Sequence, residues 1–577
     1  MKLTEKIKSN FAELNKSLSR YPLTVLISFI LVILVIVYNE LNLRSSGNLE
    51  NLMRFIQVAA LGIPLSVSLK QLAENFYEKK SSFLLTLPFL LLLLGIYYIF
   101  YSEGTEMIDG IRFAGTLFFL LVSVFFTLKL NNSEKYEVYV DRIFNGFALT
   151  VLYSAVLYFG ISAIIFTINA LFDANIDSKY YLYFFISVTL IFGVLMFLSK
   201  LPVKGEQFEG HEYSKGLKVL LLYIVIPLIT IYTLILYVYF AKILLTSEWP
   251  KGLVSNLVLW YSVLSAAVIF FITPVLEENL VARLFRTWFP RIIFPILVMM
   301  FVSIGKRIAQ YGFTEPRYYV VLLGIWVTLV MAYYVVRKDL RNIFLPVSLS
   351  IFVFVSLYGP LSGFSVSNMS QNGRLGALLE KNGMVQNGLV IPNANVPQTD
   401  RENISSIVSY FANRDITKIK YVNEDFIQED FKETFGFELV HDYSFPEQEY
   451  AYIHAELGKT PVSISGYDYM VKLNSYENTL NITDSSSITL DVKAQTVKIA
   501  EGNNSLLEVD LKAHLKALLD TYKGDGKGMM TFEEASFTDE NENVRVKFII
   551  ADLNGVKDGD SYTIENLDMF VLITLIP

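Results

Sequence analysis

The first 360 residues consist of long apolar runs separated by short polar segments. A run of about 18–20 largely uncharged residues can cross a ~30 Å hydrocarbon core as a helix, because a helix satisfies its own backbone groups without water. The pattern predicts eleven such spans, near residues 21–38, 55–71, 82–101, 113–130, 144–168, 180–199, 218–241, 253–275, 291–305, 318–336 and 342–358. We therefore expect an α-helical polytopic membrane bundle of about 11 transmembrane helices.

The first apolar run follows several lysines, so a cleaved signal peptide is the alternative to a membrane helix. The run 21–38 is longer than the apolar region of a usual signal peptide. The residues after it, 39–42, contain no small-x-small cleavage site. We expect an uncleaved first helix.

Basic residues indicate the orientation, because Lys and Arg concentrate in cytoplasmic loops. With the N-terminus inside, the inside segments hold 21 basic residues and the outside loops hold 9. An odd number of spans then places residues 361–577 outside the cytoplasmic membrane. The second and ninth spans contain Pro64 and Pro295, and a re-entrant segment at either one would reverse that side.

After Gly359 and Pro360 the sequence becomes polar. Apolar residues at helical spacing predict helices at 374–381, at 399–411 and from about 423. Alternating apolar residues predict strands at 467–473, 479–482, 488–492, 496–500, 544–550 and 569–575, with one helix near 510–522. The predicted organisation is a membrane domain, 1–360, followed by a soluble α+β domain, 361–577, which is helical over 361–440 and β-rich over 441–577.

The composition separates two environments. Of the 577 residues 53% are hydrophobic, which excludes an ordinary soluble protein of this length. Residues 1–360 carry a net charge of +8 and residues 361–577 a net charge of −15. An acidic domain repels a phosphate backbone, so we expect no nucleic-acid partner. Cysteine is absent, which excludes disulfides, thiolate zinc sites and cysteine nucleophiles.

Catalytic motifs are missing from the sequence. It has no HExxH, GxSxG or P-loop pattern, and its C-terminal histidines, His441, His454 and His514, do not have metal-ligand spacing. No charged residue lies well inside a predicted span, where transporters keep the charges that work. We therefore predict no cofactor, no metal and no catalytic residue, and favour a protein that is not an enzyme.

The most distinctive segment joins the ninth and tenth spans, at residues 306–319 (KRIAQYGFTEPRYY). Together with 286–290 (RTWFP), Gly359-Pro360, 370–375 (SQNGRL) and 379–383 (LEKNG), this segment resembles the bacterial polytopic membrane proteins of the domain of unknown function 4153 family. The resemblance implies a multi-pass protein of the bacterial inner membrane. It brings no established reaction, ligand or catalytic residue.

The same segment supplies the candidate site. Cations surround a glycine-containing bend at the membrane surface, where they could contact the acidic C-terminal domain or a lipid phosphate. The alternative is that Glu315 pairs with an arginine and Gly312 only makes the turn. The candidate interface or lipid-phosphate residues are Arg307, Tyr311, Gly312, Thr314, Glu315, Arg317 and Arg374.

Three classes of function fit this layout. The favoured one is a non-enzymatic envelope protein whose extracytoplasmic domain binds a ligand or a protein. The expected partners are membrane lipid and an envelope protein. A transporter and a membrane glycosyltransferase with a lipid-linked donor are the alternatives. The predicted loop 39–54 is short for that enzyme class, and its Glu40 and Glu50 lie apart.

Overall fold

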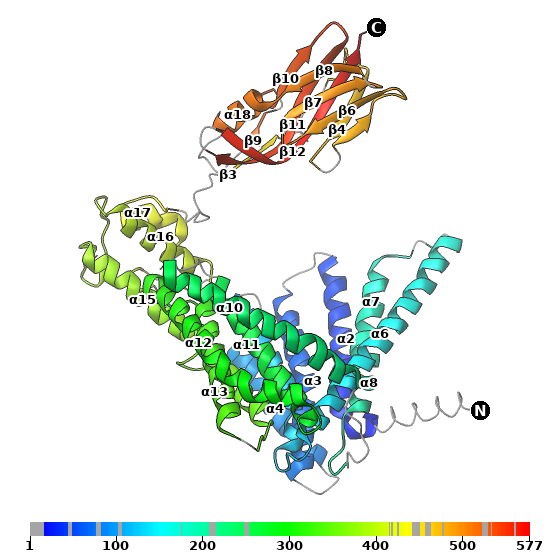
Figure 1. The fold of residues 1–577 in the computed structure, drawn as a ribbon, viewed down its shortest axis with the longest axis vertical. Coiled ribbons are helices and arrows are strands. Elements are labelled where there is room, and N and C mark those ends of the chain that lie inside the picture. Colours follow the sequence, from blue (N-terminus) through cyan, green and yellow to red (C-terminus); the bar gives the residue numbers. More distant parts are fainter. Residues whose placement is uncertain are drawn as a thin grey trace. The chain divides into compact units, whose positions relative to one another are not determined.

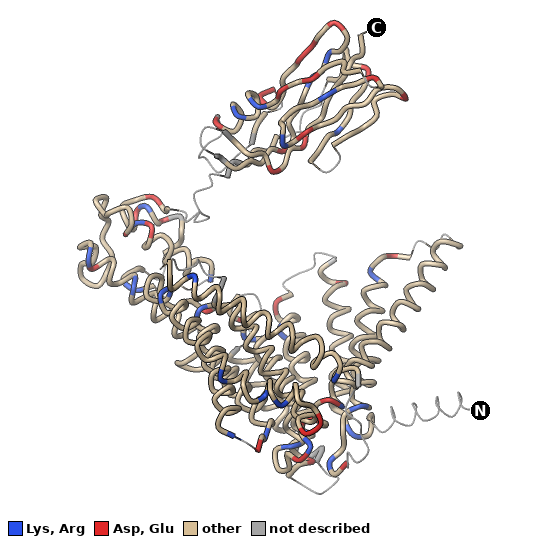
Figure 2. Tube along the Cα trace, viewed as in Figure 1, with Lys and Arg blue, Asp and Glu red and all other residues tan. Residues whose placement is uncertain are grey.

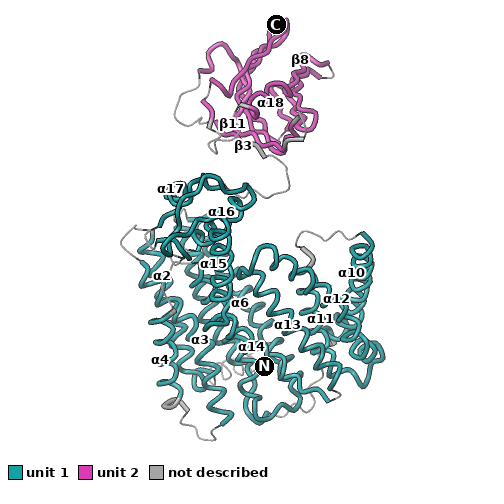
Figure 3. The backbone as a smooth tube through the Cα atoms, turned by 90° about the vertical axis from the view of Figure 1, so that its left-hand side faces the viewer, with its two compact units in different colours: residues 1–441 teal, residues 442–577 magenta. Residues whose placement is uncertain are grey.

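The computed structural model divides the chain into two units, residues 1–441 and 442–577 (Figure 3). The structure describes residues 17–43, 49–76, 82–101, 107–172, 174, 176–206, 215–246, 253–337, 339–414, 416, 419–423, 426–440, 450–455, 463–475, 478–502, 504–521, 529–531, 533–558 and 561–576.

Unit 1 is built mainly from long apolar helices (Figure 1). They are α2 (Pro22–Leu43), α3 (Glu50–Phe76), α4 (Ser82–Tyr101), α5 (Met107–Val124), α6 (Tyr136–Phe172), α7 (Lys179–Ser187), α8 (Val194–Lys200), α9 (Lys215–Val219), α10 (Ile226–Thr246), α11 (Leu253–Ile272), α12 (Leu280–Tyr311), α13 (Glu315–Val336) and α14 (Phe344–Leu357). A π turn, Val188–Gly193, joins α7 to α8, and a second one, Leu220–Val225, joins α9 to α10. Short 3₁₀ turns, Thr127–Lys129 and Thr273–Val275, follow α5 and α11.

The prediction of a helical membrane bundle is confirmed in its class. Within the described residues, nine helices are long and apolar enough to cross a membrane. The third and eleventh predicted spans fall on two shorter apolar helices, Thr86–Phe100 and Phe344–Leu357. The second and ninth fall on α3, which is 27 residues long and continues through Pro64, and on α12, which is 32 residues long and contains Pro290 and Pro295.

The outside of unit 1 is apolar, as a lipid environment requires. On α6 only 6% of the most apolar stretch is buried, and Leu152, Val156 and Phe159 are more than half exposed. Long parts of the helices carry no charge, and the charged residues gather near their ends (Figure 2). Inside the bundle α12 and α13 approach closely at Gly324, where a Cβ would lie 2.6 Å from the Met300 side chain.

Residues 361–440, which the sequence pattern predicts to belong to the C-terminal domain, are part of unit 1. They form α15 (Gly363–Lys381), the small hairpin β1 (Val385–Gln386) and β2 (Leu389–Val390), α16 (Gln398–Ala412), a 3₁₀ turn (Gln428–Asp430) and α17 (Phe431–Phe435). The Lys381 ammonium donates to both carboxylate oxygens of Asp400, at 3.1 and 2.9 Å, and so joins α15 to α16. Hydrogen bonds from Lys381 and Asn382 hold the pKa of Asp400 below its usual value.

The third predicted helix of this segment begins later than expected. We expected a helix from about Asn423, but the described residues form the 3₁₀ turn Gln428–Asp430 and then α17, Phe431–Phe435, which is followed by Gly436 with φ of +84°. Phe431 and Phe435 face one another at 4.6 Å between ring centroids, and both are buried. Both rings belong to the buried core of this segment.

Unit 2 is β-rich, as predicted. Its six-stranded sheet has the order β4 (Tyr469–Leu473), β12 (Ser561–Leu575), β11 (Val544–Asp558), β3 (Tyr450–Ala455), β9 (Met529–Met530), with β10 (Ser536–Glu540) also paired to β11. A four-stranded sheet has the order β5 (Thr479–Asn481), β6 (Ser486–Asp491), β7 (Thr496–Glu501), β8 (Asn504–Asp510). Helix α18 (Lys512–Thr521) contributes Leu515 and Leu519 to the core that the two sheets share. Leu511, directly before the helix, belongs to the same core.

The six predicted strands are present, but β11 and β12 are each 15 residues long. They form one antiparallel hairpin with register shifts between Ile550 and Asp552 and between Asn554 and Gly555. A bulge interrupts the alternation of inward and outward residues. This explains why the period-two pattern predicted only the regular part of each strand.

We expect residues 442–577 to be soluble and to unfold cooperatively when expressed alone, because their apolar residues share one buried core. Phe548 is fully buried in that core. Phe548→Ala should lower the free energy of unfolding by about 3–5 kcal/mol, measured by urea denaturation. Lys498→Ala, at an exposed position on β7, should change it by less than about 0.5 kcal/mol. Noncooperative melting of the unsubstituted fragment would contradict independent folding.

Candidate functional site

The predicted site begins at the turn between α12 and α13. Helix α12 ends at Tyr311, and Gly312 follows with φ of +71°, a conformation that favours glycine. The Gly312 N–H donates to the Ile308 carbonyl at 2.8 Å, which closes the end of the helix. Thr314 occupies the N-cap position of α13, but its side chain makes no capping hydrogen bond.

Helix α15 lies against this turn. The Gln371 amide donates to the carbonyls of Tyr311 and Phe313 at 3.0 and 2.6 Å, and the Ser370 hydroxyl accepts from the Phe313 N–H at 2.9 Å. The Arg374 guanidinium donates to the Tyr311 carbonyl at 2.5 Å and to the Gln310 carbonyl at 3.1 Å. The C-terminal carbonyls of α12, which lack helical partners, are thus bonded by side chains of α15.

Gly312 has a second reason to be glycine. A Cβ at this position would lie 2.6 Å from Arg374 Cδ and 3.0 Å from both Gln371 Nε2 and Ser370 Oγ. The close approach of α15 therefore requires a residue without a side chain. Burial lowers the pKa of Arg374, and the nearby Tyr311 opposes this effect.

Glu315 makes the most buried contact of the site. Its side chain is 4% exposed and pairs with Arg414, Nε to Oε2 at 3.1 Å, while the Tyr410 hydroxyl donates to Oε1 at 2.7 Å. The Arg414 guanidinium also lies over the Tyr410 ring, 4.1 Å from its centroid. Burial raises the pKa of Tyr410 well above its usual value, and the bond to Glu315 acts in the same direction, so the hydroxyl remains a donor.

Arg317 bonds to its own turn. Its guanidinium donates to the Gly312 carbonyl at 3.0 Å and lies 5.3 Å from the centroid of the Tyr311 ring. Arg307 is close enough to repel Arg317 electrostatically. The structure therefore brings the seven predicted residues to one place, at the turn and the adjoining face of α15. It adds Glu315's partners, Tyr410 of α16 and Arg414 just after the end of α16.

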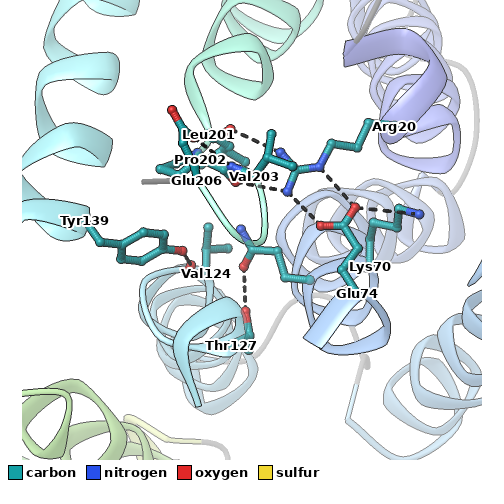
Figure 4. A network of polar contacts seen from close by, with 11 residues as sticks. Arg20, Lys70, Glu74, Val124, Thr127, Tyr139, Leu201, Pro202, Val203 and Glu206 are labelled. Carbon is teal, nitrogen blue, oxygen red and sulfur yellow. Dashed lines mark hydrogen bonds and ion pairs between the residues drawn. The ribbon is translucent and has the colours of Figure 1, made fainter. Parts of the chain in front are cut away.

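A second polar network surrounds Arg20, just before the start of α2 (Figure 4). Arg20 donates to both carboxylate oxygens of Glu74, at 3.1 and 2.7 Å, and to the carbonyls of Leu201 and Pro202, at 3.1 and 3.0 Å. Lys70 lies 3.7 Å from the same carboxylate. The Arg20 and Glu74 side chains are only 15% and 18% exposed. One guanidinium thus ties α2 and α3 to the chain that follows α8.

Buried hydroxyl and amide groups continue from this network into the bundle. Thr24 and Ser66 hydroxyls lie 2.8 Å apart, Ser68 and Ser123 hydroxyls 2.6 Å apart. The Thr127 hydroxyl donates to the Gln71 carbonyl oxygen at 2.5 Å. The network therefore joins helices α2, α3 and α5.

Across the described residues, no group of three or more His, Cys, Asp or Glu side chains is arranged to hold a metal ion.

Comparison with known proteins places the membrane helices in a family. The family model described as "Domain of unknown function (DUF4153)" matches residues 23–382, from α2 to the end of α15. The chain belongs to the DUF4153 family. The match includes the α12–α13 turn and the α15 residues that bond to it, and the predicted resemblance is confirmed.

A relative of this DUF4153 chain is the "Uncharacterized protein PM1469" of Pasteurella multocida (strain Pm70), 26% identical over 270 residues. The aligned part is 45% of this chain and 45% of the relative, so the chain spans less than half the length of the curated protein it matches. No solved structure matches the chain.

Sequence reasoning identified the α12–α13 turn of this DUF4153 chain but missed its partners Tyr410 and Arg414, and it missed the Arg20–Glu74 pair. Arg414 follows Glu315 by 99 residues, and Glu74 follows Arg20 by 54. No local spacing connects such residues. One signal was available for the second pair. Arg20 precedes the first predicted span and Glu74 follows the second, so two crossings would return the chain to the same side of the membrane.

Breaking the Glu315 contact should loosen α16. In Glu315→Gln the volume is kept but Arg414 is left buried without a carboxylate, which costs about 3–5 kcal/mol. We expect faster cleavage of the 382–440 segment by protease in membranes and a lower melting temperature of the detergent-solubilised chain.

The control is Glu438→Gln, which removes an exposed pair with Lys432 whose side chains are 67% and 75% exposed. Its effect should stay within about 1 kcal/mol. Adding Arg414→Gln to Glu315→Gln should recover part of the loss, since no buried charge then remains. Equal proteolysis of the Glu315 and Glu438 variants would show that the pair does not hold α16.

Proposed function

We propose that this protein is a non-enzymatic membrane protein of the bacterial envelope. Eleven helices form a base in the inner membrane, residues 361–440 form a mount on that base, and residues 442–577 form an extracytoplasmic module that binds a protein or an envelope component. The observation that carries the proposal is the bonding of α15 and α16 to the α12–α13 turn, through Arg374, Gln371 and Glu315.

Contacts between helix ends support eleven crossings. Arg20, before α2, bonds to the Leu201 carbonyl after α8, and the Tyr318 hydroxyl near the start of α13 donates to the Leu361 carbonyl before α15. Without a crossing by α4, Arg20 and Leu201 would lie on opposite faces of the membrane. Without a crossing by α14, Tyr318 and Leu361 would likewise lie on opposite faces of the membrane. Counting both short helices as crossings removes the conflict.

The bias of basic residues supports the side. The face that holds the N-terminal end of α2 carries 21 Lys and Arg and the other face 9, which favours a cytoplasmic N-terminus. The α12–α13 turn and the mount then lie on the extracytoplasmic face. Among the described residues after 360 there is no helix apolar and long enough to cross back.

Of the two roles considered for the seven turn residues, an internal interface is better supported than a lipid-phosphate site. The guanidinium groups of Arg317 and Arg374 donate to backbone carbonyls of the turn, and Glu315 is engaged by Arg414 and Tyr410. A phosphate would have to compete with these carbonyls for the two guanidinium groups. We therefore propose that Arg307, Thr314 and the five bonded residues around them serve to seat the mount.

The six-stranded sheet of unit 2 offers a surface for a partner. Its outward residues on β3 and β4 include Tyr452, 59% exposed, and Met470, 50% exposed, beside His454 and Lys472. The His454 ring lies 2.7 Å from the Asp552 carboxylate, which also accepts from the Tyr452 hydroxyl at 3.0 Å. Aromatic and methionine side chains next to polar groups are typical of protein interfaces.

Cysteine labelling tests the arrangement, because the chain has no cysteine of its own. Ala513→Cys, exposed on α18, should react with a membrane-impermeant maleimide in cells whose outer membrane has been permeabilised. Asp339→Cys, exposed between α13 and α14, should react only after the inner membrane is broken. The reverse pattern would invert the orientation, and labelling of both residues in intact spheroplasts would refute the eleven-crossing base.

A further inference from the structure

A cavity of about 590 Å³ lies between α6 and the end of α8, at the end of unit 1 that holds the Arg20–Glu74 pair. Its polar wall includes Arg142 and Asn145 of α6, Ser199 and Lys200 of α8, and Lys204 from the turn 203–206. A second cavity, of about 530 Å³, lies on the other side of that turn. The turn is thus a ridge between two polar hollows.

The first cavity carries an excess of positive charge. Three cations, Arg142, Lys200 and Lys204, line it together with one carboxylate, Glu206. Glu206 already pairs with Arg142 and accepts from the Val203 N–H at 3.1 Å. The Arg142 guanidinium from α6 and the Lys200 ammonium from α8 line the same cavity and provide charged donors of the kind that phosphate oxygens accept.

Beyond Asn145 the α6 side of the cavity becomes apolar and continues along the membrane helix. Leu149 lines the cavity and is 41% exposed. Leu152 and Val156 follow it at helical spacing on α6 and are 55% and 65% exposed. An apolar strip therefore runs from the cationic end of the cavity toward the middle of α6. A soluble phosphate cannot make apolar contacts with such a strip, whereas the acyl chain of a lipid can.

The ridge is held in place from the opposite side. Arg20 donates to the carbonyls of Leu201 and Pro202, and the Lys204 ammonium donates to the Asn75 carbonyl at 3.1 Å. At the floor, α6 and α8 meet at Gly146, where a Cβ would lie 2.7 Å from Lys200 Cβ. These contacts set the position of Lys200 and Lys204 against α6. Arg20 is accordingly a positioning residue for this cavity.

We propose that the cavity between α6 and α8 binds the phosphate of an anionic membrane lipid, whose acyl chains lie along the exposed strip Leu149–Leu152–Val156 of α6. Basic hollows between transmembrane helices, next to an apolar surface, suit a lipid headgroup. The site is formed by α6, α8 and the turn 203–206 of unit 1. It is independent of the binding role proposed for unit 2. Failure of one leaves the other standing.

The test is lipid retention by the full chain in detergent, followed by native mass spectrometry and thermal shift. Phosphatidylglycerol is the anionic probe, phosphatidylcholine the zwitterionic probe with the same chains, and inorganic phosphate the soluble probe. We expect one tightly retained phosphatidylglycerol, weaker retention of phosphatidylcholine and no competition by millimolar phosphate. Lys200→Gln should weaken the binding of phosphatidylglycerol about tenfold, as expected for one charge-assisted contact.

Two further variants keep the proposal open to refutation. Lys218→Gln removes a lysine that pairs with Glu278 at 3.0 Å and lines neither cavity; it should bind lipid like the unsubstituted chain. Lys200→Arg keeps the charge and should retain most of the affinity, which separates a lost contact from a misfolded bundle. Equal retention of phosphatidylglycerol by the Lys200→Gln and Lys218→Gln variants would overturn the site. Displacement of the lipid by inorganic phosphate would overturn the assignment to a lipid.

Discussion

Helices inside a bilayer gain little from bringing apolar faces together, because the lipid tails around them are as apolar as leucine. Polar contacts shielded from water then decide which helix ends meet. In unit 1 two arginine–glutamate pairs are contacts of this kind, largely shielded from water. Arg20 pairs with Glu74 near the start of α2, and Arg414 pairs with Glu315 at the start of α13. In both, the guanidinium also donates to backbone carbonyls.

Such buried pairs affect the fold mainly through the cost of leaving one charged partner buried without the other. Removing two charges from water costs nearly as much as their attraction returns, so a complete pair adds little over an apolar contact. A single buried charge left without its partner is strongly unfavourable. We interpret the pairs as devices that penalise other arrangements of the helices. The planar fork of arginine suits this use, since it fixes direction as well as charge.

The two ends of the bundle put this constraint to different uses. At the α12–α13 turn the pair joins residues 361–440 to the helices, and Gly312 allows α15 to approach the carbonyls that need donors. At the other end Arg20 holds the ridge beside a cationic cavity. Unit 2 follows different physics, because its two sheets and α18 enclose an apolar core of the kind that water creates.

The sequence by itself determined the class of the protein, the approximate places of the apolar helices that the structure describes and the β-rich character of the C-terminal region. These properties depend on local hydrophobic periodicity, which a linear pattern records. It also indicated that the segment around Tyr311 and Gly312 is special. Only the tertiary structure decided that Glu315 pairs with Arg414, that Arg20 reaches Glu74 and Leu201, and that residues 361–440 contact the membrane helices. Those contacts join residues 54 to 181 positions apart, and their partners are chosen by the packing of whole helices, which no local spacing encodes.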